Sequence, residues 1–227
     1  SIVVPTIWHP LTAAQLLGIA LTFGLNGGSV VEKRNPLMSK LNEEIANSAL
    51  TIVDDGQDPE KVSTQTIDGE GTGKQKTPVI ENGVLKSFLF DRLYANAFGT
   101  ESTGNAIRED NARFEVLPQI RPNKLVIEPH AKTLDEQIAE CDKGIYIEGN
   151  LMGIGHANFI TGDFSVTATN AYLVEKGEIK YPLKPVSIAG NFFKSLKDLS
   201  IIGSDVTPTF LPMDAPALTI LNHTTSG

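Results

Sequence analysis

The residue types that most often carry catalysis are few in this sequence, and they are widely separated. Its four histidines are His9, His130, His156 and His223, and no two of them fall within one helical turn. Zinc sites commonly take two of their ligands from one local motif, such as H-E-x-x-H on a helix. No such motif occurs here, so the histidine spacing alone predicts no metal site.

The candidate nucleophiles are equally isolated. Cys141 falls on the apolar side of an expected helix, between Glu140 and Asp142, whose charges would raise the pKa of its thiol. The G-x-S-x-G motif of serine hydrolases is absent. Ser1 could act as a nucleophile with its own amine as the base only at a mature N-terminus, and we expect it to be the cut end of a longer protein. The residues by themselves therefore predict no catalytic group.

Composition excludes several classes of protein. The 227 residues carry a formal net charge of −8 and no basic run, which argues against direct nucleic-acid binding. The longest apolar stretch, residues 11–25, falls short of the roughly 20 residues that span a bilayer. No basic segment precedes it, as one would in a signal peptide. The single cysteine excludes an internal disulfide. We therefore expect a cytoplasmic protein with no membrane segment.

Several helices can be predicted from apolar spacing and capping residues. The segment 10–25 is apolar almost all round, which is typical of a buried helix. A second helix is expected after Asn35-Pro36, with Leu37, Leu41 and Ile45 along one face. Three more are expected at residues 91–98, 133–143 and 191–199.

Strand and turn signals complete an α+β pattern. Single strands are expected at residues 50–53, 144–148 and 217–221, and hairpins at 79–90 and 159–182. In the second hairpin, one face is expected to carry Phe164, Val166, Ala168, Asn170, Tyr172 and Val174. Hairpins mixed with helices, without regular βαβ alternation, indicate a large antiparallel or mixed sheet with flanking helices.

Two polar segments, residues 56–76 and 101–113, are expected to form loops. The first contains Gly69-Glu70-Gly71-Thr72-Gly73-Lys74, which lacks the spacing of a phosphate-binding loop, and Glu70 would repel a phosphate. Loops of this length are more often functional than simple connectors.

A series of short blocks in these elements resembles one known family. The blocks cover nearly the whole chain and lie at residues 51–55, 68–71, 79–86, 102–106, 161–165, 172–182, 188–191 and 216–227. Their order and content resemble the C-terminal region of the TldD/PmbA family, which is often labelled modulator of DNA gyrase. Each block alone is weak, but the series is specific.

The resemblance implies a sheet-rich C-terminal region over residues 1–227, without the N-terminal domain of the family. Family members work in pairs. TldD-type subunits are zinc peptidases that carry H-E-x-x-x-H on a helix near the start of this region and a Cys ligand near the chain end. PmbA-type subunits, also called TldE-type, lack these ligands and pair with the TldD type.

The sequence departs from the TldD pattern at each catalytic position. The expected motif helix begins His9-Pro10, so that Pro10 replaces the glutamate and Ala14 replaces the second histidine. No cysteine follows Gly203-Ser204-Asp205. Without the glutamate there is no general base for a zinc-bound water, and without the ligands there is no zinc. We therefore predict a non-catalytic PmbA/TldE-like subunit with no metal and no cofactor.

The predicted partner is a TldD-like metallopeptidase subunit in a hetero-oligomer, or a second copy in a homodimer, and the predicted substrate is a peptide. An extended peptide can be held by adding it to a sheet edge. The candidates for lining this cavity or the interface are Gly69, Glu70, Gly71, Ser102, Thr103, Gly104 and Asn105. Each could equally be an ordinary turn residue that serves the fold.

Other interpretations stay open. An active metallopeptidase could combine His9 with ligands from the missing N-terminal region, and its zinc content would reveal it. A peptide-binding or regulatory module that acts alone would form monomers or homodimers and ignore a TldD-type protein. The gyrase label suggests a topoisomerase or DNA partner, although the charge of −8 argues against direct DNA contact.

Overall fold

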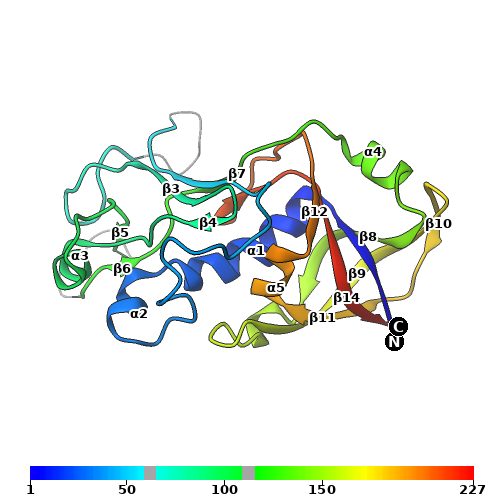
Figure 1. Ribbon diagram of the computed structural model, residues 1–227, viewed down its shortest axis with the longest axis horizontal. Coiled ribbons are helices and arrows are strands. Elements are labelled where there is room, and N and C mark those ends of the chain that lie inside the picture. Colours follow the sequence, from blue (N-terminus) through cyan, green and yellow to red (C-terminus); the bar gives the residue numbers. More distant parts are fainter. Residues whose placement is uncertain (59–64, 109–115) are drawn as a thin grey trace.

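Two sheets and one buried helix organise the computed structural model, which describes residues 1–58, 65–108 and 116–227 (Figure 1). The larger sheet has the order β1-β8-β9-β11-β14-β12, with β10 added beside β9. The smaller sheet has the order β13-β7-β2-β3-β4. Parallel and antiparallel pairs both occur, so the predicted α+β class with a mixed sheet is confirmed.

The larger sheet closes on itself. Its ring consists of β1 (Ile2–Trp8), β8 (Lys143–Met152), β9 (Asp163–Glu175), β11 (Val186–Asn191) and β14 (Leu218–Ser226). β1 pairs parallel with β8 on one side and antiparallel with β14 on the other, which joins the two ends of the chain. The termini therefore lie side by side in Figure 1.

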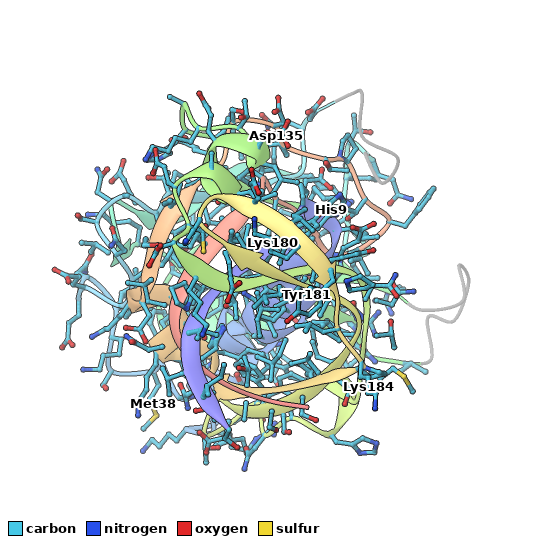
Figure 2. All side chains as sticks on the ribbon, turned by 90° about the vertical axis from the view of Figure 1, so that its right-hand side faces the viewer. His9, Met38, Asp135, Lys180, Tyr181 and Lys184 are labelled. Atoms are coloured by element: carbon cyan, nitrogen blue, oxygen red, sulfur yellow. The ribbon has the colours of Figure 1, made fainter. Side chains whose placement is uncertain are left out.

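Two shorter strands extend this ring. β12 (Leu199–Ile202) pairs with the start of β14, and β10 (Glu178–Pro182) pairs with the end of β9. All five residues of β10 are exposed, and Figure 2 looks directly onto this strand, with Lys180 and Tyr181 labelled. Lysine and proline on an exposed edge discourage pairing with another strand. β10 is therefore a poor place to add a peptide.

The smaller sheet lies over the other side of the buried helix. Its strands are β2 (Ile52–Asp55), β3 (Lys76–Glu81), β4 (Val84–Leu85), β7 (Leu125–Ile127) and β13 (Met213–Asp214). A separate pair, β5 (Ala106–Ile107) and β6 (Gln119–Ile120), stands beside it. The predicted Asn82-Gly83 turn joins β3 to β4, with φ of 49° and 79° at these residues, as a type I′ turn requires.

Helix α1 (Pro10–Gly24) is the centre of the core. It touches β8 of the larger sheet and β13 of the smaller sheet. Leu16, Leu17 and Leu21 are at most 1% exposed, and full burial of one such side chain contributes roughly 1.5–3 kcal/mol. A helix that is apolar almost all round is expected to be buried, and the prediction for residues 10–25 is confirmed except in the last turn, where Phe23 is 51% exposed. Among the described residues, no helix is long and apolar enough to cross a membrane.

The remaining helices are short. They are α2 (Gly27–Val31), α3 (Arg92–Phe98), α4 (Leu134–Ala139), the 3₁₀ turn η1 (Ile154–His156) and α5 (Phe192–Lys197). The predicted capping box of α4 is formed between Thr133 and Glu136, and Gly99 ends α3 with φ of 85°. α4 stops before the predicted end at residue 143, because Lys143 already begins β8. Helix α2 was not predicted.

The helix predicted after Asn35-Pro36 is not formed. The side chain of Asn35 accepts the Leu37 N–H at 2.7 Å, but only turns follow. The backbone instead bonds to the hairpin, with Asn42 N–H donating to Leu85 O at 2.7 Å and Leu85 N–H donating to Glu43 O at 3.0 Å. These bonds satisfy the open edge of β4, a requirement that local periodicity does not reveal.

Two strand predictions need correction. β2 runs from Ile52 to Asp55, not from 50 to 53, so both aspartates lie inside the strand. In β9, residues 164–168 alternate as predicted, but Asn170 is exposed and Ala171 is buried. The neighbouring strand shifts its register between Glu148 and Leu151, and such a bulge bends and twists the pair.

The two predicted loop segments are only partly covered by the structure. Residues 59–64 of the first and 109–113 of the second lie outside the described residues. The described parts of both segments are mostly irregular, as predicted, apart from Lys76, which begins β3, and β5 in the second segment.

Candidate functional site

The start of α1 holds the three positions that the sequence marks as a degenerate motif. His9 is the N-cap, its backbone N–H donates to Ile147 O at 2.9 Å, and its Nδ1 accepts the Leu11 N–H at 3.3 Å. Pro10 occupies the first turn, where its missing N–H and fixed φ suit a helix start. Ala14 is fully buried. These residues therefore start and pack a helix.

The zinc ion that the motif would hold does not fit these residues. His9 offers one imidazole whose Nδ1 already faces its own helix, Pro10 has no carboxylate, and Ala14 has only a methyl group. In the described parts of the chain, no three His, Cys, Asp or Glu side chains come close enough to hold a metal ion. Burial, and next the charge of Asp142, raises the pKa of the Cys141 thiol, which disfavours the thiolate that metals bind.

The two candidate loops are brought into direct contact. We define the paired loops as residues 65–75 and 101–108. Gly69 N–H donates to Ala106 O at 2.7 Å, and the Gln75 side-chain amide donates to Ser102 O at 3.1 Å. At Gly104, a Cβ would lie only 2.6 Å from Gly73 O. The sequence singled out both loops, and the structure shows that they form one surface.

Asp68 is the residue that shapes the first loop. Its Oδ1 accepts the N–H groups of Glu70 and Thr72, both at 2.9 Å, and its Oδ2 accepts the Ala106 N–H at 3.1 Å. The Glu70 carboxylate is also engaged, because it accepts the Arg92 N–H at 2.8 Å. Glu70 therefore closes the loop against α3, while Gly71 is exposed with φ of 76°.

The second loop is held by its hydroxyl groups against Phe90. Thr103 Oγ1 accepts the Phe90 N–H at 2.7 Å and donates to Asn105 Oδ1 at 2.6 Å. Ser102 Oγ donates to Phe90 O at 3.1 Å. Ser102 and Thr103 are thus used to fix the loop, which leaves neither of them poised as a nucleophile with a base.

Asp54 is the buried anchor beneath the paired loops. Its Oδ2 accepts Asn105 Nδ2 at 2.7 Å and Asn123 Nδ2 at 3.2 Å, and its Oδ1 accepts the Lys124 N–H at 2.8 Å. Burial raises the pKa of Asp54, although these bonds oppose the rise. Sequence reasoning placed Asp54 at a strand end and missed this role. The one available signal was a charged pair, Asp54-Asp55, next to apolar strand residues.

Lys74 is a buried cation near this anchor. It is 9% exposed. Burial lowers the pKa of its ammonium group, while the charges of Asp54 and Asp68 oppose that shift. A buried cation near two carboxylates offsets part of their negative charge. Hydrogen bonds to Asp54, Asp68 and Phe90 therefore hold the paired loops in one arrangement.

A second buried polar cluster involves His223, which the sequence showed only as a scattered histidine. Its Nε2 lies 2.8 Å from Ser195 Oγ and its Nδ1 lies 2.8 Å from Thr6 Oγ1. Trp8 Nε1 donates to the same Thr6 hydroxyl at 2.8 Å. The serine and histidine resemble a hydrolase pair, but both are only 2% exposed. Since no substrate reaches them, their role is to join β1, β14 and α5.

This cluster predicts sensitivity to acid. Burial lowers the pKa of His223 from 6.5 to about 4, with the charge of Asp198 opposing the shift. As the pH falls, the unfolded chain takes up the proton first, so stability present above pH 6.5 is lost progressively down to pH 4. We expect urea unfolding to show a larger loss between pH 7 and pH 5 for the wild type than for His223→Gln. Exposed His156→Gln is the control, and equal pH dependence in all three proteins would contradict the assignment.

Comparisons with known proteins point to one family. A family model described as the PmbA/TldA metallopeptidase C-terminal domain matches residues 1–227. A metalloprotease TldD homolog of Buchnera aphidicola is 32% identical over 191 residues, which is 84% of this chain and 38% of that relative.

Solved structures share the fold as well. TldE from Thermococcus kodakarensis superposes with a TM-score of 0.87 and 32% identity, covering 99% of this chain and 50% of its own. A candidate modulator of DNA gyrase from Thermotoga maritima gives a TM-score of 0.89 at 30% identity, covering 98% of this chain and 49% of its own. The chain thus spans half or less of the length of these relatives.

Proposed function

Since the chain belongs to the PmbA/TldA metallopeptidase C-terminal-domain family, we propose that it is part of a PmbA/TldE-like subunit that does not cleave peptides itself. The observation that carries this proposal is the start of α1. Overall similarity does not decide between subunit types, because relatives named TldD and TldE are equally close at 32% identity. The residues His9, Pro10 and Ala14 support the TldE-like assignment, since Pro10 and Ala14 offer neither the general base nor the second histidine of a zinc peptidase.

In this proposal, a TldD-type subunit supplies the zinc and the general base, and this chain completes the peptide cavity. The paired loops support that role because hydrogen bonds to Asp54, Asp68 and Phe90 hold them in one arrangement. A surface that is already ordered loses little entropy when it binds a flexible peptide. The paired loops are therefore the part of the chain that we assign to the cavity or to the subunit interface.

The proposal is tested by reconstitution with the full-length protein and a TldD-type subunit from the same organism. We expect an unstructured peptide to be cleaved by the mixture and not by this protein alone. His9→Ala should leave the rate of the mixture within about twofold, because its imidazole holds no metal in this proposal. Replacing the motif glutamate of the TldD-type subunit by Gln should lower the rate by about 10²–10⁴-fold, as removal of a general base does.

Three outcomes would overturn the proposal. Peptide cleavage by this protein alone would identify an active metallopeptidase. Loss of cleavage in the mixture that contains His9→Ala would show that the imidazole of His9 is needed for catalysis. Failure to bind the TldD-type subunit, with stable monomers or homodimers instead, would favour a module that acts independently.

A further inference from the structure

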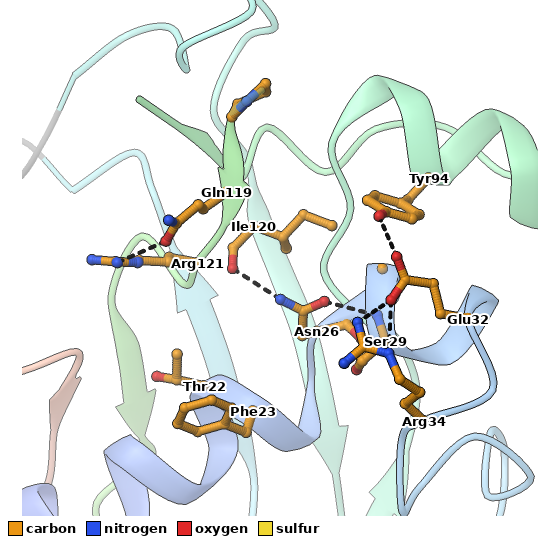
Figure 3. A pocket seen from close by; sticks show the side chains of 12 residues that line it. Thr22, Phe23, Asn26, Ser29, Glu32, Arg34, Tyr94, Gln119, Ile120 and Arg121 are labelled. Atoms are coloured by element: carbon orange, nitrogen blue, oxygen red, sulfur yellow. Dashed lines mark hydrogen bonds and ion pairs between the residues drawn. The ribbon is translucent and has the colours of Figure 1, made fainter. Parts of the chain in front are cut away.

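A cavity of about 410 Å³ opens beside helix α2, away from the start of α1 (Figure 3). We define the α2 pocket by six of its lining residues, Phe23, Glu32, Arg34, Tyr94, Ile120 and Arg121. They come from the end of α1, the segment that follows α2, helix α3, and β6 with the residue after it. The volume lies in the range that proteins use for ligands of small-molecule size.

The charged groups of the pocket wall are paired with one another or with neighbouring side chains. Tyr94 OH donates to Glu32 Oε1 at 2.6 Å, and Arg34 Nε donates to Glu32 Oε2 at 2.9 Å. On the other side of the pocket, Arg121 Nη2 donates to Gln119 Oε1 at 2.8 Å (Figure 3). Since these groups already have partners within the protein, the wall does not select a ligand by its charge.

Four phenylalanine rings stack in a row that ends at this pocket. Phe164 stacks on Phe192 with ring centroids 4.7 Å apart, and Phe192 stacks on Phe159 at 5.9 Å. Phe159 in turn stacks on Phe23 at 4.3 Å, with ring planes that differ by 14°. Phe164 and Phe192 are buried, whereas Phe23 is exposed. The row therefore runs from the core to the surface, and Phe23 is its outer end.

The outer end of this row opens into the pocket. Phe159 covers one face of the Phe23 ring, and yet the Phe23 side chain is 51% exposed and lines the cavity. Figure 3 shows the Phe23 ring at the base of the pocket, with Tyr94 on the opposite side. Aromatic rings prefer offset-stacked contacts with other rings. A row of rings that ends in a cavity therefore offers a stacking position to one more ring.

The opposite wall contains a second ring, that of Tyr94, which is held in place. Its hydroxyl is bonded to Glu32, and at Gly28 an added Cβ would lie 3.0 Å from Tyr94 Cε2. The ring therefore packs directly against the backbone of α2. A cavity with fixed rings on two sides and paired polar groups around them suits a flat apolar ligand.

We propose that the α2 pocket binds an aromatic side chain of an unfolded peptide, whose ring stacks on Phe23. The peptide as ligand rests on the proposed function, whereas the preference for an aromatic ring rests on the pocket alone. The pocket adjoins the paired loops, because Ile120 of its wall pairs with Ala106 of the second loop. A peptide held at the paired loops can therefore place a side chain in this pocket.

Binding of fluorescent peptides to the full-length protein tests this inference. The probe is an unstructured peptide with a single Phe at its centre, and two matched peptides carry Leu or Ala in its place. We expect Ala to weaken binding about tenfold or more, because the buried side chain is lost. Leu is expected to weaken binding about threefold, because it fills the pocket but does not stack. Equal binding of the Phe and Leu peptides, or no binding of any of the three, would overturn the inference.

Variants of the protein provide an independent arm. Phe23→Leu removes the exposed ring and keeps an apolar side chain, so it is expected to abolish the preference for Phe over Leu in the peptide. Phe98→Leu is the matched control, because Phe98 is also exposed and packs on Phe90 with ring centroids 5.0 Å apart, outside the α2 pocket. An unchanged preference in folded Phe23→Leu would overturn the inference.

Two further measurements separate this inference from the proposed function. Weaker binding of the TldD-type subunit to Phe23→Leu, with unchanged peptide binding, would mean that the partner subunit fills the pocket, which overturns the peptide as its occupant. Cleavage by the TldD-type mixture still reports separately on the proposed function, since that test does not compare peptides with Phe, Leu and Ala.

Discussion

Replacing Asp54 with asparagine (D54N) is expected to lower the free energy of unfolding by about 3 kcal/mol. Both carboxylate oxygens of Asp54 accept hydrogen bonds, from Asn105 and Asn123 at Oδ2 and from the Lys124 N–H at Oδ1. In either orientation, the NH₂ group of an asparagine would face one of these donors. The buried donor would then lose its acceptor, which is the costly case for a buried polar group.

Urea unfolding measures this effect, with Glu81→Gln as the matched control. Glu81 lies on neighbouring strand β3, is exposed, and forms a long ion pair with Lys86 at 3.9 Å. Its replacement is expected to change the free energy of unfolding by less than about 0.5 kcal/mol. Equal effects of D54N and Glu81→Gln would mean that Asp54 does not anchor the paired loops.

Gly104→Ala is expected to lower the free energy of unfolding by about 3 kcal/mol and to separate the paired loops. Gly104 has φ of 73°, and an added Cβ would lie 2.6 Å from Gly73 O and 2.9 Å from Lys74 Cα. The left-handed backbone costs an alanine roughly 1–2 kcal/mol. The contact with backbone atoms adds roughly 1–3 kcal/mol, because neither side can move aside as a flexible side chain would.

Alanine substitutions at two glycines of the first loop measure the backbone cost separately from the cost of the close contact. Gly71 has φ of 76° but an added Cβ would meet nothing within 4 Å, and Gly73 has neither a positive φ nor a close neighbour. Gly71→Ala should therefore cost about 1 kcal/mol through its backbone alone, and Gly73→Ala close to nothing. Thermal and urea unfolding measure the series. An effect of Gly104→Ala no larger than that of Gly71→Ala would show that the loops are not in close contact.

Local features of the fold could be predicted from the sequence. The capping box at Thr133, the Asn82-Gly83 turn and the buried helix α1 depend on residues within a few positions of one another. The helix predicted after Asn35 does not form for the opposite reason. The backbone of that segment forms hydrogen bonds with a hairpin more than 40 residues away. The closure of β1 onto β8 and β14 is equally non-local.

The same division applies to the candidate site. The composition of the segments around Gly69 and Gly104 was enough to predict two loops. It could not predict that the loops touch each other through the hydrogen bond from Gly69 to Ala106. Asp54 looked like a strand end because its burial depends on Asn105 and Asn123 from distant segments. The α2 pocket is assembled from several separate segments, and no single segment carries a motif for it.

Zinc analysis of a complex with the TldD-type subunit, followed by separation of the two chains, tests the central claim most directly. Full-length protein is purified without a chelator or a His-tag, so that metal is neither stripped nor added. The start of α1, with His9, Pro10 and Ala14, predicts only trace zinc on this chain and about one zinc per TldD-type chain. About one tightly held zinc on this chain would contradict the account.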